Sequence, residues 1–66
     1  MKLNPWFVFT NLARASALVA EYARLECFRC VMHGDAEKAA AWARESYRTR
    51  QQAVWAALRA VRSVQG

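Results

Sequence analysis

The positions of the helix-breaking residues constrain this chain more than any other feature of its sequence. Its 66 residues contain one proline, Pro5, and two glycines, Gly34 and Gly66. Proline and glycine are the residues that interrupt helices most strongly, and here they stand only at the start, the middle and the end. We therefore expect two long helices of nearly equal length, separated at Gly34.

Local signals mark where each helix begins and ends. Asn4 before Pro5 is typical of an N-cap followed by the first helical position. A start at Thr10 or Asn11 is the alternative, and it would leave residues 6–9 extended, as their aromatic and β-branched side chains favour.

At the centre of the chain, Gly34 suits the left-handed position that closes a helix, and Asp35 suits the N-cap of the next. The prediction is a single all-α domain over residues 1–66, an antiparallel two-helix hairpin with helices at about 5–33 and 36–64 and a turn at 34–35.

Apolar side chains predict which faces are buried. Helix one has one apolar face at Leu18, Tyr22, Leu25 and Met32, and a second at Val8, Leu12, Val19, Ala23, Cys27 and Cys30. The expected core face of helix two comprises Ala40, Ala43, Tyr47, Val54, Leu58 and Val61, widened by Trp42, Ala53, Ala57, Ala60 and Val64.

A single partner helix covers only one face of helix one, so the other face requires a second partner. We expect a homodimer with a four-helix arrangement, because the small side chains of helix one permit close approach: Ala13, Ala15, Ala17 and Ala20.

One polar stripe on helix two is the main candidate binding surface. Its members recur every three or four residues and therefore share a face: Arg44, Arg48, Gln52, Trp55, Arg59 and Arg62. Tryptophan and arginine are enriched among the residues that dominate binding energy at interfaces. The alternative is a solvated face on which Trp55 is covered by the dimer partner.

The stripe fits two kinds of partner. An acidic or mixed protein surface would use the arginines as rim contacts and Trp55 as the core. A nucleic acid would be held through its phosphates, with Trp55 stacking on a base. The net charge of +5 is modest for a dedicated nucleic-acid binder, which favours a protein partner.

Three aromatic residues near the start, Trp6, Phe7 and Phe9, form a second candidate contact. They pack over a partner helix if helix one begins at Pro5. If the segment is extended, it could pair with its twin or dock on a target. An amphipathic membrane anchor is a third interpretation.

The spacing of Cys27, Cys30 and His33 resembles a metal-binding motif but lacks a fourth ligand and a second element. The cysteines also lie near a helix C-terminus, where the helix dipole does not favour a thiolate. We expect buried cysteines in a dimer core, a capping role for the His33 side chain, and no metal or cofactor.

Several function classes are disfavoured. A chain this short cannot build a large cleft, and it lacks paired carboxylates on one face, a glycine-rich phosphate loop and a nucleophile elbow. No apolar run reaches the roughly 18 residues of a membrane span. Asn11 and Arg14 interrupt the first apolar run before it resembles a signal peptide. We expect a non-enzymatic cytoplasmic protein with reduced thiols.

Two resemblances extend this interpretation. The equal arms and expected dimer resemble the plasmid RNA-binding hairpin Rop in architecture. The chain also resembles the quorum-sensing anti-activators encoded by bacteriophages, on the segment Leu25 to His33, the Gly34–Asp35 turn, and the arginine- and aromatic-rich segment Trp42 to Trp55. The second resemblance implies a small helical dimer that inhibits a host transcription regulator by binding it.

Overall fold

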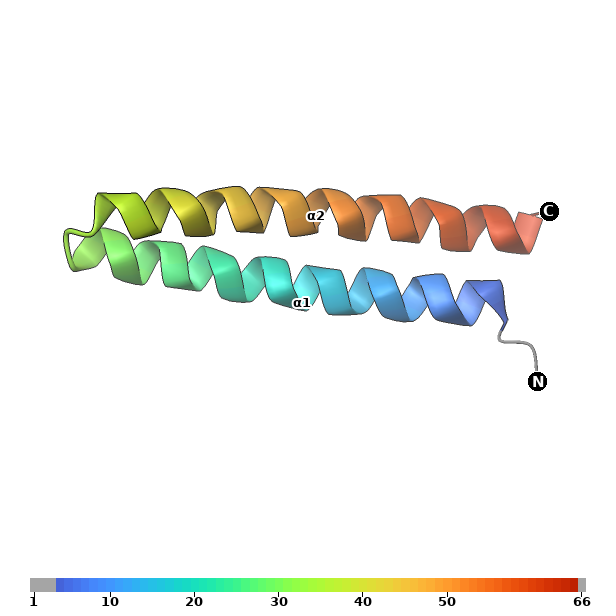
Figure 1. Cartoon of the computed structure of the whole chain (residues 1–66). Coiled ribbons are helices and arrows are strands. Elements are labelled where there is room, and N and C mark those ends of the chain that lie inside the picture. Colours follow the sequence, from blue (N-terminus) through green and yellow to red (C-terminus); the bar gives the residue numbers. More distant parts are fainter. Residues whose placement is uncertain (1–3, 66) are drawn as a thin grey trace.

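The computed structural model, which describes residues 4–65, shows two long helices lying side by side in opposite directions (Figure 1). Helix α1 covers Pro5–Met32 and helix α2 covers Ala36–Gln65. The described residues form a rod with extents of 48 × 19 × 12 Å, with the start of α1 and the end of α2 at one end and the turn at the other. The expected all-α antiparallel hairpin is confirmed.

The first helix begins at Pro5, as the Asn4–Pro5 pair predicts. The side-chain oxygen Oδ1 of Asn4 accepts a hydrogen bond of 2.9 Å from the backbone N–H of Trp6. This bond satisfies one of the amide donors that a helix start leaves without a partner. Residues 6–9 are therefore helical, and the alternative start at Thr10 or Asn11 is wrong.

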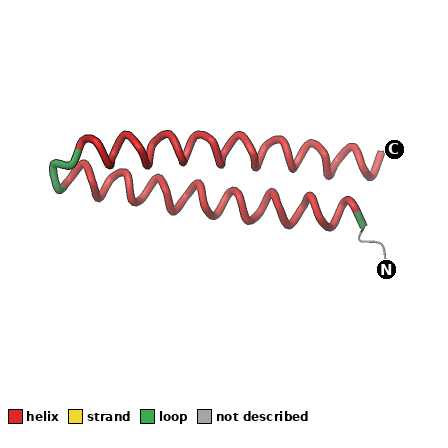
Figure 2. Tube along the Cα trace, in the orientation of Figure 1, coloured by secondary structure: helices red, strands yellow, loops and turns green. Residues whose placement is uncertain are grey.

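The turn has the geometry that its residues predict (Figure 2). Gly34 adopts a φ of 76°, in the left-handed region that glycine tolerates best. Asp35 caps α2, since its Oδ1 accepts a 3.1 Å bond from the N–H of Lys38. His33 occupies the C-cap of α1, where its backbone N–H donates to the carbonyl of Arg29, and its side chain is exposed.

Mostly small side chains form the contact between the two helices. On α1 the contact residues are spaced by three and four: Phe9, Ala13, Ser16, Ala20, Ala23, Cys27 and Cys30. On α2 they follow the same spacing: Ala39, Trp42, Ser46, Thr49, Ala53, Ala56 and Ala60. This repeat is typical of coiled coils, and small side chains at it let two helix backbones approach closely. We call these two rows the seam.

The predicted core face of helix two is wrong for the hairpin. Tyr47, Val54, Leu58 and Val61 are each more than half exposed, and the smaller members Ala40 and Ala43 are exposed as well. Within residues 4–65 every side chain of the buried class is alanine, serine or threonine. The physical reason is close packing: the small side chains bring the helices together, and the large ones are left outside the seam.

Of the additional residues predicted to widen that face, some lie in the seam and the others are exposed. Ala60 is buried, and Trp42 and Ala53 are half-buried in the seam. The other two, Ala57 and Val64, are exposed.

The two apolar faces predicted on α1 differ in how far they are buried. Three members of the second face belong to the seam, Ala23, Cys27 and Cys30, and Leu12 is half-buried without belonging to it. The first face, from Leu18 to Met32, is exposed, as are Val8 and Val19 of the second. Of the alanines expected to bring two copies together, Ala13 and Ala20 serve instead to bring α2 close within one chain, because they lie in the seam.

Two hydroxyl groups in the seam, those of Ser46 and Thr49, have hydrogen-bond partners. The Oγ of Ser46 donates a 3.0 Å hydrogen bond to the carbonyl oxygen of Ala20 on the other helix. Thr49 Oγ1 lies 2.9 Å from the carbonyl oxygen of Glu45 on its own helix. These bonds offset the cost of removing hydroxyls from water, so polar side chains fit the seam without a penalty.

Candidate interaction surface

The six residues of the predicted stripe are all exposed along α2. The stripe, as used below, comprises Arg44, Arg48, Gln52, Trp55, Arg59 and Arg62. The helix orients them by its period alone, because positions three and four apart point the same way. The seam lies on another side of α2, so packing against α1 leaves the arginines of this face open to water.

The members of the stripe differ in how freely their charges are available. Arg48 is bound to Glu45 through two nitrogens, at 2.7 and 3.2 Å. The hydrogen bond lowers the pKa of Glu45 and raises the pKa of Arg48. Arg44, Arg59 and Arg62 have no carboxylate oxygen within 4.0 Å among residues 4–65, so their charges are open to an external partner.

Trp55 is held in place by contacts across the hairpin. Its ring meets the ring of Phe9 edge-on, with centroids 5.7 Å apart and planes at 83°. The guanidinium carbon of Arg59 lies 5.4 Å from the Trp55 ring and 6.0 Å from the Phe9 ring. Nevertheless, 49% of Trp55 remains exposed. The structure therefore presents a half-exposed indole that packs edge-on against Phe9, with a cation beside it.

The three aromatic residues of the second predicted contact do not share one environment in the structure. Phe9 is half-buried against Trp55 and so belongs to the hairpin, whereas Trp6 and Phe7 are 45% and 56% exposed. One turn of α1 thus contributes both an internal contact and an exposed aromatic pair. The pair lies in the first turn of α1. This is the end of the rod opposite the turn between the helices, and we call it the open end.

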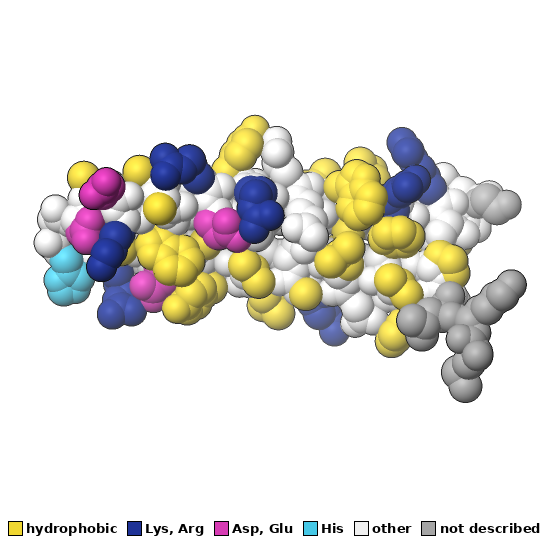
Figure 3. All heavy atoms as spheres, in the orientation of Figure 1, with side chains coloured by type: hydrophobic (Ala, Val, Ile, Leu, Met, Phe, Trp, Pro, Cys, Tyr) yellow, Lys and Arg dark blue, Asp and Glu magenta, His cyan; other side chains and the backbone are white. Residues whose placement is uncertain are grey.

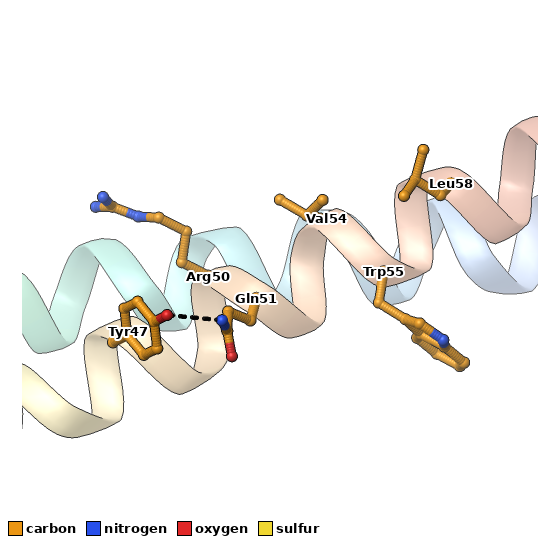
Figure 4. Close-up of a pocket in the computed structure, with 6 residues that line it drawn as sticks. All are labelled: Tyr47, Arg50, Gln51, Val54, Trp55 and Leu58. Atoms are coloured by element: carbon orange, nitrogen blue, oxygen red, sulfur yellow. Dashed lines mark hydrogen bonds between the residues drawn. The ribbon is translucent and has the colours of Figure 1, made fainter.

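A shallow apolar groove adjoins the stripe along the outer side of α2 (Figure 4). It has a volume of about 470 Å³ and is lined by Tyr47, Arg50, Gln51, Val54, Trp55 and Leu58. Val54 and Leu58 project toward one side of the helix and Trp55 toward another (Figure 4), so Trp55 belongs to both the groove and the stripe. At one end, the Nε2 of Gln51 donates a 2.8 Å bond to the Tyr47 hydroxyl.

Sequence reasoning missed five of these groove residues as candidate site residues. It assigned Tyr47, Val54 and Leu58 to the core and did not single out Arg50 or Gln51. The signal that would have found the groove is the ladder of small residues from Ala39 to Ala60. That ladder occupies the side facing α1 and therefore leaves the larger residues outside.

Charges are distributed unevenly along the rod. All five acidic residues fall between Glu21 and Glu45, toward the turn, where four of them pair with a basic residue three positions later: Glu21, Glu26, Asp35 and Glu45. The acidic side chains visible in Figure 3 accordingly gather in the half of the molecule near the turn. The open end carries Arg14, Arg59 and Arg62 with no acidic residue nearby in sequence.

The cysteines and His33 do not form a common site. Cys27 and Cys30 are free, half-buried thiols that line the seam within one chain, whereas His33 is exposed at the C-cap. Within residues 4–65, no three histidine, cysteine or acidic side chains gather in a way that could hold a metal ion.

Comparisons with known proteins leave the function to be argued from this geometry. No protein-family model matches the chain, and no curated protein or solved structure shows a significant similarity to it. Over residues 4–65, neither helix combines the length and apolar character needed to cross a bilayer.

Proposed function

We propose that this chain is a non-enzymatic protein-interaction module that binds a partner protein through the stripe and the adjoining groove. The observation that carries the proposal is the placement of Trp55 between the apolar groove and the open charges of Arg59 and Arg62. Centrally placed aromatic and arginine residues supply most of the binding energy in many interfaces. An indole already packed against Phe9 in the free chain would lose less conformational freedom on binding than an unsupported one, which favours affinity.

The groove indicates the chemistry of the partner. Its lining is largely apolar and open along α2, so it suits a ridge of apolar side chains, such as one face of a helix. The unpaired arginines beside it favour carboxylates at the edge of that ridge. Binding would act by occlusion, because the rod would cover a surface that the partner needs for another contact.

The resemblance to phage-encoded anti-activators suggests the class of partner. On that basis we propose a phage or prophage inhibitor that works in the bacterial cytoplasm and sequesters a transcription regulator. The binding residues would be those of the stripe, with Trp6 and Phe7 as a second contact at the open end. This assignment follows from the resemblance, whereas the interaction module follows from the exposed surface.

A nucleic-acid partner is the second candidate, and a different observation favours it. Five arginines have no carboxylate within 4.0 Å in the described part of the chain: Arg14, Arg44, Arg50, Arg59 and Arg62. Phosphates could satisfy them. The apolar lining of the groove favours protein instead, because phosphate backbones have no matching apolar ridge.

Affinity capture from a bacterial lysate with two charge-reversal variants tests the proposal. Arg62→Glu alters the stripe, and Arg14→Glu makes the same change on α1; both arginines are exposed and have no described ion pair. We expect a discrete protein that survives nuclease treatment, is lost with Arg62→Glu and is retained with Arg14→Glu. Capture that disappears with nuclease would show a nucleic-acid partner. Equal loss with both variants would contradict a role for the stripe.

A further inference from the structure

Outside the seam, α1 carries a second row of residues with coiled-coil spacing. Its members are separated by three and four residues throughout: Val8, Asn11, Ala15, Leu18, Tyr22, Leu25, Arg29 and Met32. All eight are exposed, and Leu18, Tyr22 and Leu25 are each more than half exposed. One of these members, Tyr22, also meets the ring of Trp42 on α2 edge-on, with centroids 5.8 Å apart. We call this row the outer ladder. A helix with two such rows is built to pack against two helices, and α2 occupies only one of them.

The chain exposes more surface than expected for its mass, and the excess is similar to the area that one interface buries on each partner. The chain exposes 5362 Å². A folded monomer of its mass, 7.5 kDa, is expected to expose about 4,200 Å² from the scaling of surface with size. The excess is on the order of 1,000 Å², and a standard interface buries about 800 Å² on each partner. Part of the excess reflects the elongated shape, and the large apolar residues on α1 are the area best removed by a contact.

The outer ladder is complementary to itself when two copies run in opposite directions. Its spacing is the same when counted from either end. In an antiparallel pair, each member therefore lies opposite the residue of the second copy whose number, added to its own, gives 40. The small Ala15 then lies opposite the large Leu25 of the second copy, and Leu18 lies opposite Tyr22. Alternation of small and large side chains across a contact is what close packing requires.

The ends of the ladder agree with the same register. Val8 falls opposite Met32, and the polar residues Asn11 and Arg29 fall opposite each other. With the polar residues opposite each other, neither packs against an apolar side chain, where it would lack a hydrogen-bond partner. A parallel arrangement would instead place Arg29 against Arg29, with a cost from the like charges.

We infer that a second copy of this chain covers the outer ladder of α1, with the two α1 helices antiparallel about a two-fold axis that passes between Leu18 and Tyr22 of the ladder. The resulting four-helix arrangement has the α1 pair at its centre and one α2 on each side. The axis makes the contact closed, so association stops at two copies.

The charges of the two helices favour α1 over α2 as the contact. Helix α1 carries three arginines and two glutamates, and both glutamates are paired with an arginine three positions later. Helix α2 carries six basic residues and only two glutamates. A contact between two α2 helices would bring the positive charges of both copies together. A contact between two α1 helices keeps the positively charged α2 helices apart. The stripe and the groove stay free, so the inference does not rest on the proposed function.

The mass in solution tests the contact directly. By light scattering at micromolar concentration, the wild-type chain is expected to have twice its 7.5 kDa mass. Leu18→Glu should shift the mass toward one copy, because it places a charge in the centre of the ladder. The matched control, Leu58→Glu on α2, should leave the dimer intact. A monomeric wild type, an open-ended series of masses, or loss of the dimer with Leu58→Glu would each overturn the inference.

Orientation is tested separately, in case Leu18→Glu also unfolds the chain. Spin labels would be attached to Met32→Cys in a background with Cys27→Ala and Cys30→Ala. In the antiparallel register the two labels lie about 36 Å apart along the helix axis, from the rise of 1.5 Å per residue. A separation near 10 Å, the usual distance between packed helix axes, would show a parallel dimer and overturn the register.

Discussion

Ser46 on α2 donates a hydrogen bond to the carbonyl oxygen of Ala20 on α1, across 26 positions of sequence and a distance of 3.0 Å. A serine hydroxyl is short, so this bond forms only where two helix backbones lie close together. Ala20 and Ser46 have relative exposures of 4% and 9%. This hydrogen bond fixes how the two helices align at the centre of the hairpin. Because the backbones lie so close there, the size of side chain that neighbouring seam positions tolerate is limited.

Enlarging a seam residue should destabilise the hairpin strongly. Ala56 is fully buried, and Ala56→Leu adds atoms where the helices leave no room. Overpacking of this kind costs about 1–3 kcal/mol in the free energy of unfolding. The adjacent Ala57 is exposed, so Ala57→Leu is the matched control and should change stability little. Urea unfolding followed by circular dichroism measures both. Equal losses would show that the seam is not closely packed.

The left-handed turn should depend on Gly34 for conformational reasons alone. A Cβ built at Gly34 would meet no atom within 4 Å, so substitution creates no clash, but its φ of 76° disfavours other residues. We expect Gly34→Ala to lower the free energy of unfolding by about 1–2 kcal/mol. Gly34→Asn should lower it less, because asparagine tolerates this conformation. Thermal unfolding distinguishes them, and an unchanged midpoint for Gly34→Ala would contradict the assignment.

The contact between Phe9 and Trp55 should be measurable as a coupling energy. The rings meet edge-on with centroids 5.7 Å apart, an arrangement that contributes about 0.5–1.5 kcal/mol beyond the area buried. A double-mutant cycle with Phe9→Leu and Trp55→Leu isolates this contribution from the unfolding free energies. Additive effects of the two substitutions would show that the rings do not interact, and Trp55 would then be mobile in the free protein.

Stability should fall in acid through the ion pairs. The hydrogen bond from Arg48 lowers the pKa of Glu45, and Arg24 does the same for Glu21. A lowered pKa in the folded state means that the unfolded chain binds protons first as the pH falls. The contribution is therefore present above the ordinary carboxyl pKa of about 4.5 and is lost as the pH falls through the lowered value.

The measurement is the thermal midpoint followed from neutral pH downward, in the wild type and in Glu45→Gln. The variant should show a shallower decline, because one of the two carboxylates with a lowered pKa is gone. Glu21 is exposed and Glu45 is only half-buried, so the difference should be small and should shrink further in salt. A steeper decline in Glu45→Gln would contradict the role of the pair.

The ends of the helices could be predicted from sequence because their chemistry is local. Asn4 with Pro5 and Gly34 with Asp35 define the caps and the turn whatever lies against the helices. The buried face of α2 could not be read in the same way. Large apolar residues such as Tyr47 and Leu58 indicate a face that is to be covered, but periodicity does not say whether the chain itself or another molecule covers it.

The candidate site was predictable to the extent that it lies on one helix. The stripe follows from the helical period, so its exposed face was expected. The contact of Phe9 with Trp55 joins positions 46 residues apart, and it depends on how α1 and α2 align. That alignment is set by the small residues of the seam, whose importance is apparent only once the two rows are seen together.

The confinement of every acidic residue to the half near the turn makes the rod an electric dipole. Its positive pole is the open end, where Arg14, Arg59 and Arg62 lie. Near an anionic surface, the molecule would be turned before it makes contact, with the open end leading and the stripe carried toward the target. Such steering reaches about one Debye length, roughly 8 Å at physiological ionic strength. Salt would then slow the encounter more than it weakens the complex, because apolar contacts in the groove are unaffected by screening.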